Sequence, residues 1–168
     1  MTLADVLVDA FGRVRSSVSA VLDGLGDEQL QYQPDAEANT IAWLVWHLTR
    51  VQDDHVADAA GMEQVWAAGG WRERFDLALE PLDTGYGHTP EQVTRVRAPA
   101  ELLDAYNEAV HEQTVGYVRT LGEADLDRIV DTRWDPPVSL GVRLVSVVDD
   151  DLEHVGQAAY VRGLAERR

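Results

Sequence analysis

The sequence contains no cysteine among its 168 residues. Disulfide bonds and a cysteine nucleophile are therefore both excluded, although the redox compartment stays undetermined. The consequence for catalysis is specific. If thiol chemistry takes place on this chain, the sulfur has to arrive on a small molecule.

Positive charge is scarce. Fourteen basic residues stand against thirty acidic ones, which gives a formal net charge of -16. Such a chain repels phosphate backbones and anionic lipid headgroups. We therefore expect neither a nucleic acid nor a membrane surface as its partner.

Long hydrophobic runs are also missing. No segment approaches the roughly 18 consecutive apolar residues of a membrane span. The first residues open an amphipathic helix and lack the basic region and apolar stretch of a secretory signal. A cytoplasmic location is the resulting expectation.

Strand-forming alternation, internal repeats and low-complexity segments are not detectable either. A hydrophobic fraction of 45% with 26% charged residues is ordinary for a globular protein. The length suits one core. We predict a single domain over residues 1–168.

What the sequence does contain is helical periodicity, with apolar residues recurring at spacings of three and four. The predicted long helices cover about residues 3–25, 40–60, 99–121 and 140–166. Asn39 or Thr40 can cap the second of these helices and Ser139 the fourth. A short helical piece is predicted at 123–130.

Residues 61–98 show no sustained period and hold several glycines and prolines. A connection this long inside a compact domain is usually functional or a crossover. The three connections are thus moderate, long and moderate. This order predicts an all-α fold, a four-helix bundle running up-down-down-up, with the long crossover between its second and third helices.

A candidate metal site lies in the last predicted helix. Asp150 precedes His154 by four residues, so both side chains share one helix face about one turn apart. A third ligand could come from His47, at the edge of the apolar stripe of the second helix. We predict that His47, Asp150 and His154 meet inside the bundle and bind one divalent metal with an open position.

Two alternatives compete with this prediction. A carboxylate and a histidine four residues apart often form only a hydrogen bond or ion pair on a helix surface. Asp149, Asp150 and Asp151 also stand in a row at mid-helix, where their mutual repulsion needs an offset. A cation would supply it, but so would Arg50 or Arg143 across the bundle.

The remaining histidines have simpler interpretations. His55 with Asp58, and Glu108 with His111, are rival pairs at a spacing of three. His88, in a glycine-rich loop, either faces a substrate or is solvated, and solvation is the more common case.

Three segments of the sequence resemble the DinB-like superfamily: Asn39–Leu48, Asp83–Pro90 and Asp150–Gly163. More narrowly, they are similar to its actinobacterial branch, which includes mycothiol-dependent transferases and maleylpyruvate isomerases. The likeness extends over nearly the whole chain. It implies a four-helix bundle that holds a divalent metal, usually zinc or nickel.

In that superfamily the ligands are a histidine of the second helix and two residues one turn apart on the fourth. The resemblance therefore implies His47, Asp150 and His154 as the metal ligands. Relatives commonly carry Glu or His in place of Asp150, and many have a second histidine where this chain has Gln157. The shorter Asp side chain must bring its helix closer to the metal or bind through water.

By this resemblance, we expect a divalent-metal-dependent enzyme that uses a mycothiol-like thiol in transfer to, or isomerisation of, a small electrophile. Substrate contacts are to be sought at Tyr86, His88, Gln157, Tyr160 and Arg162. Family analogy suggests a homodimer. Two alternatives stay open: a metal-dependent hydrolase that activates water, and a non-catalytic dimeric bundle with a degraded metal site.

Overall fold

The computed structural model describes residues 1–167, and most of these residues are helical. The long helices are α1 (Leu3–Leu22), α3 (Ile41–Ala60), α7 (Ala100–Val118) and α8 (Leu140–Ala165). Each lies within three residues of its predicted boundaries. The predicted helical class is thereby confirmed, with one small two-stranded sheet added to it.

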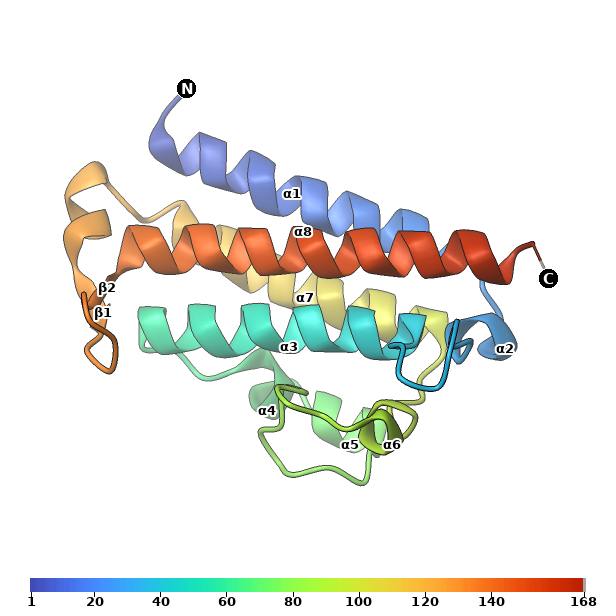
Figure 1. Ribbon diagram of the computed structural model, residues 1–168. Helices are drawn as coiled ribbons and strands as arrows, with labels where there is room; N and C mark the ends of the chain where they lie inside the picture. Colours follow the sequence, from blue (N-terminus) through green and yellow to red (C-terminus); the bar gives the residue numbers. More distant parts are fainter. Residues whose placement is uncertain (168) are drawn as a thin grey trace.

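The long helices pack side by side, and each contacts two others. α3 packs against α7 and α8, and α1 packs against the same two helices. α1 and α8 run in one direction, and α3 and α7 run in the other (Figure 1). Within residues 1–167, none of the helices is both long and apolar enough to cross a membrane.

Side-chain caps define where these helices begin. The Thr40 hydroxyl accepts a hydrogen bond from the backbone N–H of Trp43 at 3.1 Å. Ser139 accepts from the N–H of Val142 in the same way. Both caps satisfy amide groups that have no partner inside the helix. α3 ends at Gly61, whose left-handed backbone (φ 65°) suits glycine.

The long connection between α3 and α7 lies on the side of α3 that faces away from α8 (Figure 1). It contains three short helices, α4 (Val65–Ala68), α5 (Trp71–Phe75) and α6 (Pro90–Val93). Helices of four or five residues complete barely one turn, so they leave no periodicity to detect in the sequence. A similar short helix, α2 (Asp27–Leu30), lies in the connection before α3.

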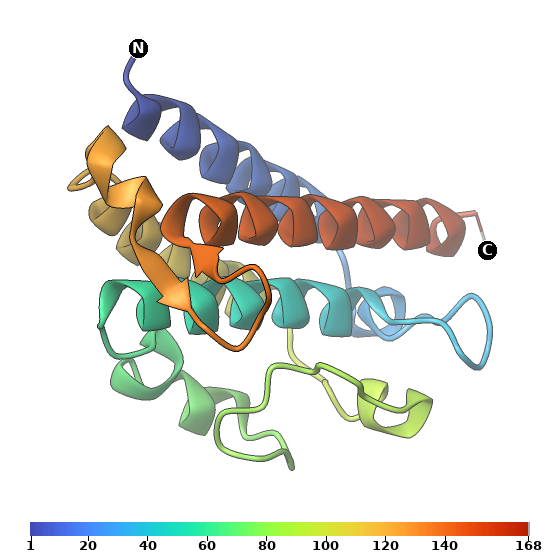
Figure 2. The ribbon, with the colours of Figure 1, turned by 60° about the vertical axis from the view of Figure 1, so that its left-hand side comes forward.

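One predicted element is partly wrong. The helical piece expected at 123–130 ends early, as the 3-10 helix η1 (Glu123–Asp127). It is followed by strand β1 (Ile129–Asp131), which pairs antiparallel with β2 (Val138–Ser139). Figure 2 shows this hairpin beside the beginning of α8. Strands of three and two residues are too short to produce an alternating pattern.

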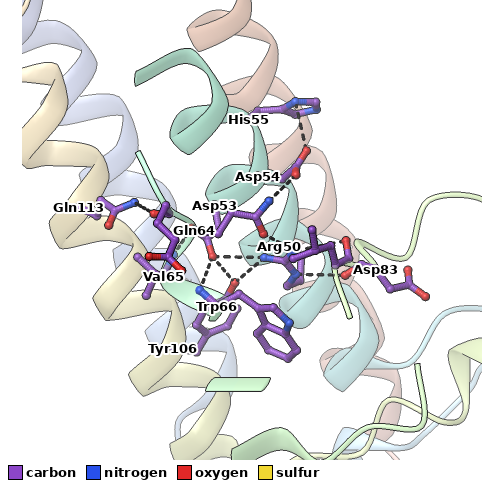
Figure 3. A network of polar contacts seen from close by, with 12 residues as sticks. Arg50, Asp53, Asp54, His55, Gln64, Val65, Trp66, Asp83, Tyr106 and Gln113 are labelled. Atoms are coloured by element: carbon purple, nitrogen blue, oxygen red, sulfur yellow. Dashed lines mark hydrogen bonds and ion pairs between the residues drawn. The ribbon is translucent and has the colours of Figure 1, made fainter. Parts of the chain in front are cut away.

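A buried arginine fastens the long connection to α3 (Figure 3). The Arg50 side chain is 0% exposed. Its guanidinium donates to the Gln64 side-chain oxygen at 2.7 Å, the Tyr106 hydroxyl at 3.1 Å and the Asp83 carbonyl at 3.1 Å. One side chain of α3 therefore holds α7 and two points of the connection.

Asp53, one turn along α3, completes this network. Its carboxylate pairs with Arg50 at 3.2 Å and accepts from the Tyr106 hydroxyl at 2.8 Å. It also accepts from the backbone N–H groups of Val65 and Trp66, both at 2.8 Å. These two amides belong to the first turn of α4, whose N-cap residue Gln64 forms no side-chain cap. Asp53 of α3 caps this helix in its place.

We expect Arg50→Met to lower the free energy of unfolding by about 3–5 kcal/mol, because it leaves the Asp53 carboxylate buried without its cation. Urea denaturation followed by circular dichroism measures this change. Arg13→Met is the matched control, since Arg13 and its partner Asp9 are 74% and 63% exposed. The free energy of unfolding of that variant is expected to match that of the wild type. Equal stability of both variants would contradict the importance of the network.

Candidate metal centre

The structure brings together the three residues that the sequence singled out. His47 comes from α3, whereas Asp150 and His154 come from α8, the helix packed against it. One potential ligand atom from each of the three lies within 4.8 Å of the others. The two imidazole rings have centroids 4.7 Å apart and are tilted by 59°. These three side chains form a group that could hold a metal ion.

Hydrogen bonds to backbone carbonyls define the state of both rings. His154 Nδ1 is 2.8 Å from the carbonyl oxygen of Asp150, and His47 Nδ1 bonds to the carbonyl oxygen of Thr84. A carbonyl only accepts, so Nδ1 carries the hydrogen in each ring. In the neutral rings Nε2 is therefore the bare nitrogen, available to a cation.

Asp150 contributes an acceptor without a donor. Its side chain is 34% exposed, but its Oδ2 atom is shielded from solvent. Within the described part of the chain, Oδ2 has no hydrogen-bond partner. Leaving such an atom unpaired is costly. The only ion-pair contact of Oδ2 within the described residues is with His154 Nδ1, at 3.7 Å. Two imidazole nitrogens and a carboxylate oxygen without a hydrogen bond are a donor set that suits a divalent cation such as zinc or nickel.

The alternative partners for the aspartates are engaged elsewhere. Arg50 belongs to the network around Asp53. Arg143 donates to Asp131 at 2.8 Å and contacts His55 Nδ1 at 3.3 Å. Neither arginine therefore offsets the acidic run of α8.

Burial lowers the pKa of His47, and the nearby His154 lowers it further, against the opposing effect of the Thr84 carbonyl. The side chain is only 6% exposed. It stacks on the Trp43 ring with centroids 4.5 Å apart and planes 14° apart. Because its pKa lies below the ordinary value, the ring is neutral at neutral pH, which is the form that binds metals.

A cavity of about 650 Å³ adjoins the cluster, and both His47 and Asp150 line it. Tyr86 and Trp134 stand at its wall with 93% and 66% of their surface exposed. Such exposed aromatic rings beside a polar cluster are typical of a ligand site. The structure thus combines a cation-type donor set with space for a small organic molecule.

The β1–β2 hairpin supplies the charged wall of this cavity. The Asp131 carboxylate accepts from Arg133 at 2.9 and 3.0 Å and from Arg143 at 2.8 Å. The hydrogen bonds from Arg133 hold the pKa of Asp131 well below its ordinary value. Sequence reasoning missed Asp131 and Arg133, and it considered Arg143 only as a partner for Asp149, Asp150 and Asp151. Only the turn-forming Trp134–Pro137 stretch marked the region, and no spacing connected it to α3.

Comparison with known proteins identifies the family of this chain. The profile of a family described as mycothiol-S-transferase matches residues 6–166. The chain belongs to the mycothiol-S-transferase family. This family is a member of the DinB-like superfamily, as the resemblance predicted.

The structural comparison agrees in shape. The crystal structure of a conserved protein from Enterococcus faecalis is similar to this mycothiol-S-transferase family member, with a TM-score of 0.92 and 29% sequence identity. The match covers 100% of this chain and 99% of that one. No curated protein matches the chain.

The five residues at which substrate contacts were expected do not all lie at the cavity beside the cluster. Tyr86 lines the cavity. His88 does not, and it is not solvated, because its side chain is 4% exposed and bonded to Asp83. Gln157 and Tyr160 line a separate hollow nearer the end of α8, beside Pro34 and Leu44. Arg162 donates to carbonyls of α1.

The rival histidine pairs do not form as expected. His55 contacts Arg143 and lies 3.8 Å from Asp54 rather than pairing with Asp58. Glu108 pairs with Arg15 instead of His111. Helix spacing alone therefore did not identify the partners, since His55 and Glu108 each contact an arginine of another helix.

Asp151, next to the cluster, is 0% exposed, and neither of its carboxylate oxygens has a partner among residues 1–167. Burial, together with the adjacent Asp150, raises the pKa of Asp151 well above its ordinary 3.8. The folded state therefore holds this proton more tightly than the unfolded state. The contribution of Asp151 to the free energy of unfolding is therefore largest below the pKa of this group in the unfolded state, and it falls as the pH rises toward the pKa in the folded state.

We expect Asp151→Asn to raise the free energy of unfolding at pH 8 by about 1 kcal/mol or more, because the wild-type carboxyl must either take up a proton on folding or be buried as a charge without a partner. The gain should disappear near pH 4, where the wild-type carboxyl is protonated. Urea denaturation of chelator-treated protein at both pH values measures this. Asp149→Asn, at an exposed position of the same helix, is the control. Similar pH dependence in the two variants would refute the assignment.

Proposed function

We propose that this protein is a divalent-metal-dependent enzyme that uses a low-molecular-weight thiol, mycothiol or a close analogue, to modify a small electrophile. One observation carries the proposal. One potential ligand atom from each of His47, Asp150 and His154 lies within 4.8 Å of the others, beside a cavity that His47 and Asp150 line. Membership of the mycothiol-S-transferase family supports the choice of thiol and of reaction class.

In this proposal His47, Asp150 and His154 hold the cation, with zinc or nickel as the candidates. Three protein ligands leave at least one position open for a substrate atom. A divalent cation at this place supplies a Lewis acid that favours the thiolate form of a bound thiol. The absence of cysteine from the chain agrees with a sulfur nucleophile that comes from solution.

The protein's own residues then orient the two imidazole rings and contact the thiol and the electrophile. The Thr84 and Asp150 carbonyls hold the two imidazoles in the tautomer that presents Nε2. Trp43 covers one face of the His47 ring. Tyr86 and Trp134 offer exposed aromatic faces to the organic parts of thiol and electrophile.

The cavity arginines are not free cations. Arg133 of the hairpin and Arg143 of α8 both bond to Asp131. Asp54 and Asp150 also line the cavity, so three carboxylates stand against two guanidiniums, and an electrophile without strong negative charge suits this lining better than a polyanion. The overall charge of -16 favours the same choice.

We further propose that residues 1–168 form one domain, a four-helix bundle in up-down-down-up order. The directions and contacts of α1, α3, α7 and α8 support this. A homodimer stays a prediction, which analytical ultracentrifugation can test.

We expect protein purified without chelators to contain about one divalent ion per chain, and His47→Ala and His154→Ala to lose it, since each removes a ligand. Elemental analysis measures the content. His111→Ala is the control, because His111 lies on α7, outside the three-residue cluster. Metal-free wild-type protein that also fails to bind added zinc or nickel would leave the non-catalytic interpretation in place.

We expect the metal-loaded protein to consume a chromogenic aryl halide only when thiol is present. Release of halide with and without mycothiol measures this dependence. His154→Ala should lose at least about 100-fold in kcat/KM, because removing the cation removes stabilisation of the thiolate. Turnover that needs no thiol would instead favour the hydrolase.

A further inference from the structure

The segment Leu82–His88 lies against α3 beside the metal-site histidine, and its backbone contacts that ring directly. The carbonyl of Thr84 bonds to His47 Nδ1. The next residue, Gly85, has a left-handed backbone with φ +89°. The segment therefore reaches the imidazole with main-chain atoms.

Gly85 leaves no room for a side chain. A Cβ atom at this position would lie 2.9 Å from His47 Nδ1, 3.0 Å from the Trp46 ring and 3.2 Å from the Trp43 ring. These distances are shorter than ordinary carbon contacts. All three rings are buried on α3. Any substituent at residue 85 must push either the segment or the His47 ring away.

Hydrogen bonds hold the segment in this place. The Asp83 carboxylate accepts from the N–H of Gly85 at 2.7 Å and from His88 Nε2 at 3.0 Å. His88 Nδ1 in turn accepts from the Trp43 indole at 3.1 Å. The indole only donates, so Nδ1 of His88 is bare and its Nε2 carries the hydrogen that Asp83 receives.

The buried arginine anchors the same segment from the other side. Arg50 Nε donates to the Asp83 carbonyl at 3.1 Å, and Figure 3 shows its guanidinium between Asp83 and the groups of α4 and α7. Side chains of α3 thus form hydrogen bonds with the segment near both of its ends, at Asp83 and at His88. The Thr84 carbonyl has little freedom to leave His47.

We propose that Gly85 is a positioning residue that seats the Thr84 carbonyl on His47 Nδ1, and so fixes the ring orientation and tautomer that present Nε2 to the cluster. The effect on the metal rests on the proposed function, whereas the effect on the ring does not. Carbonyl partners of this kind orient metal-binding imidazoles generally, and their loss typically weakens metal affinity about 10–100-fold.

The chain offers a matched control in the same segment. Gly87 also has a left-handed backbone, with φ +74°, but a Cβ added there would meet no atom within 4 Å. Alanine at either position imposes backbone strain, whereas only alanine at residue 85 meets His47. Comparison of Gly85→Ala with Gly87→Ala therefore separates positioning of the ring from strain in the segment.

The first measurement is the nitrogen-15 spectrum of the imidazole rings in metal-free protein. Wild type and Gly87→Ala are expected to show His47 protonated at Nδ1 and bare at Nε2. Gly85→Ala is expected to show a mixed or inverted pattern for that ring alone. The second measurement is Zn²⁺ affinity by competition with a chromophoric chelator. Gly85→Ala should bind about 10–100-fold more weakly, and Gly87→Ala within about threefold of wild type.

An unchanged His47 spectrum in Gly85→Ala overturns the proposal. If wild type binds no Zn²⁺ while the spectra differ as expected, the metal function fails and the positioning role stands. If Gly85→Ala does not fold, Asp83→Ala carries the test, because it removes the acceptor of Gly85 N–H and His88 without adding bulk. That variant should also disturb the His47 spectrum, and a wild-type spectrum there would equally overturn the proposal.

Discussion

The packing of α3 against α8 is the contact on which the candidate site depends. It brings His47 to Asp150 and His154 across about a hundred residues of sequence, and the two imidazole rings approach to 4.7 Å between centroids. Such proximity of polar groups would be unfavourable unless the packing around them enforced it. Apolar side chains of both helices belong to one hydrophobic core, so their burial holds α3 and α8 together before any cation arrives.

The long connection between α3 and α7 takes part in orienting the candidate site. Its amide and carbonyl groups need partners, and α3 supplies them through Arg50 and Asp53. The same interactions set the Thr84 carbonyl against His47. Stability of the connection and orientation of the site are therefore parts of one hydrogen-bonded system rather than separate features.

Neighbouring acids of α8 have opposite environments. Asp150 lies beside His154, with 3.7 Å between its Oδ2 and the ring Nδ1, whereas Asp151 is buried and its carboxylate has no hydrogen-bond partner among the described residues. Burial raises the pKa of Asp151 well above its ordinary value. A chain that tolerates this cost beside its candidate metal centre shows the conflict between stability and site chemistry that functional regions often contain.

Periodicity and local chemistry were enough to predict the four long helices, the cap at Ser139, a cap at Asn39 or Thr40 of which Thr40 is the one formed, and the shared face of Asp150 and His154. These features depend on residues within a few turns of one another, so the sequence by itself determined them. His47 was predicted as the third member from its place on a helix and from family resemblance. The hairpin residues Asp131 and Trp134, the burial of His88 and the close approach of Gly85 were decided only by the tertiary structure. Each of them depends on contacts between segments far apart in the chain, and no local pattern records which distant groups will meet.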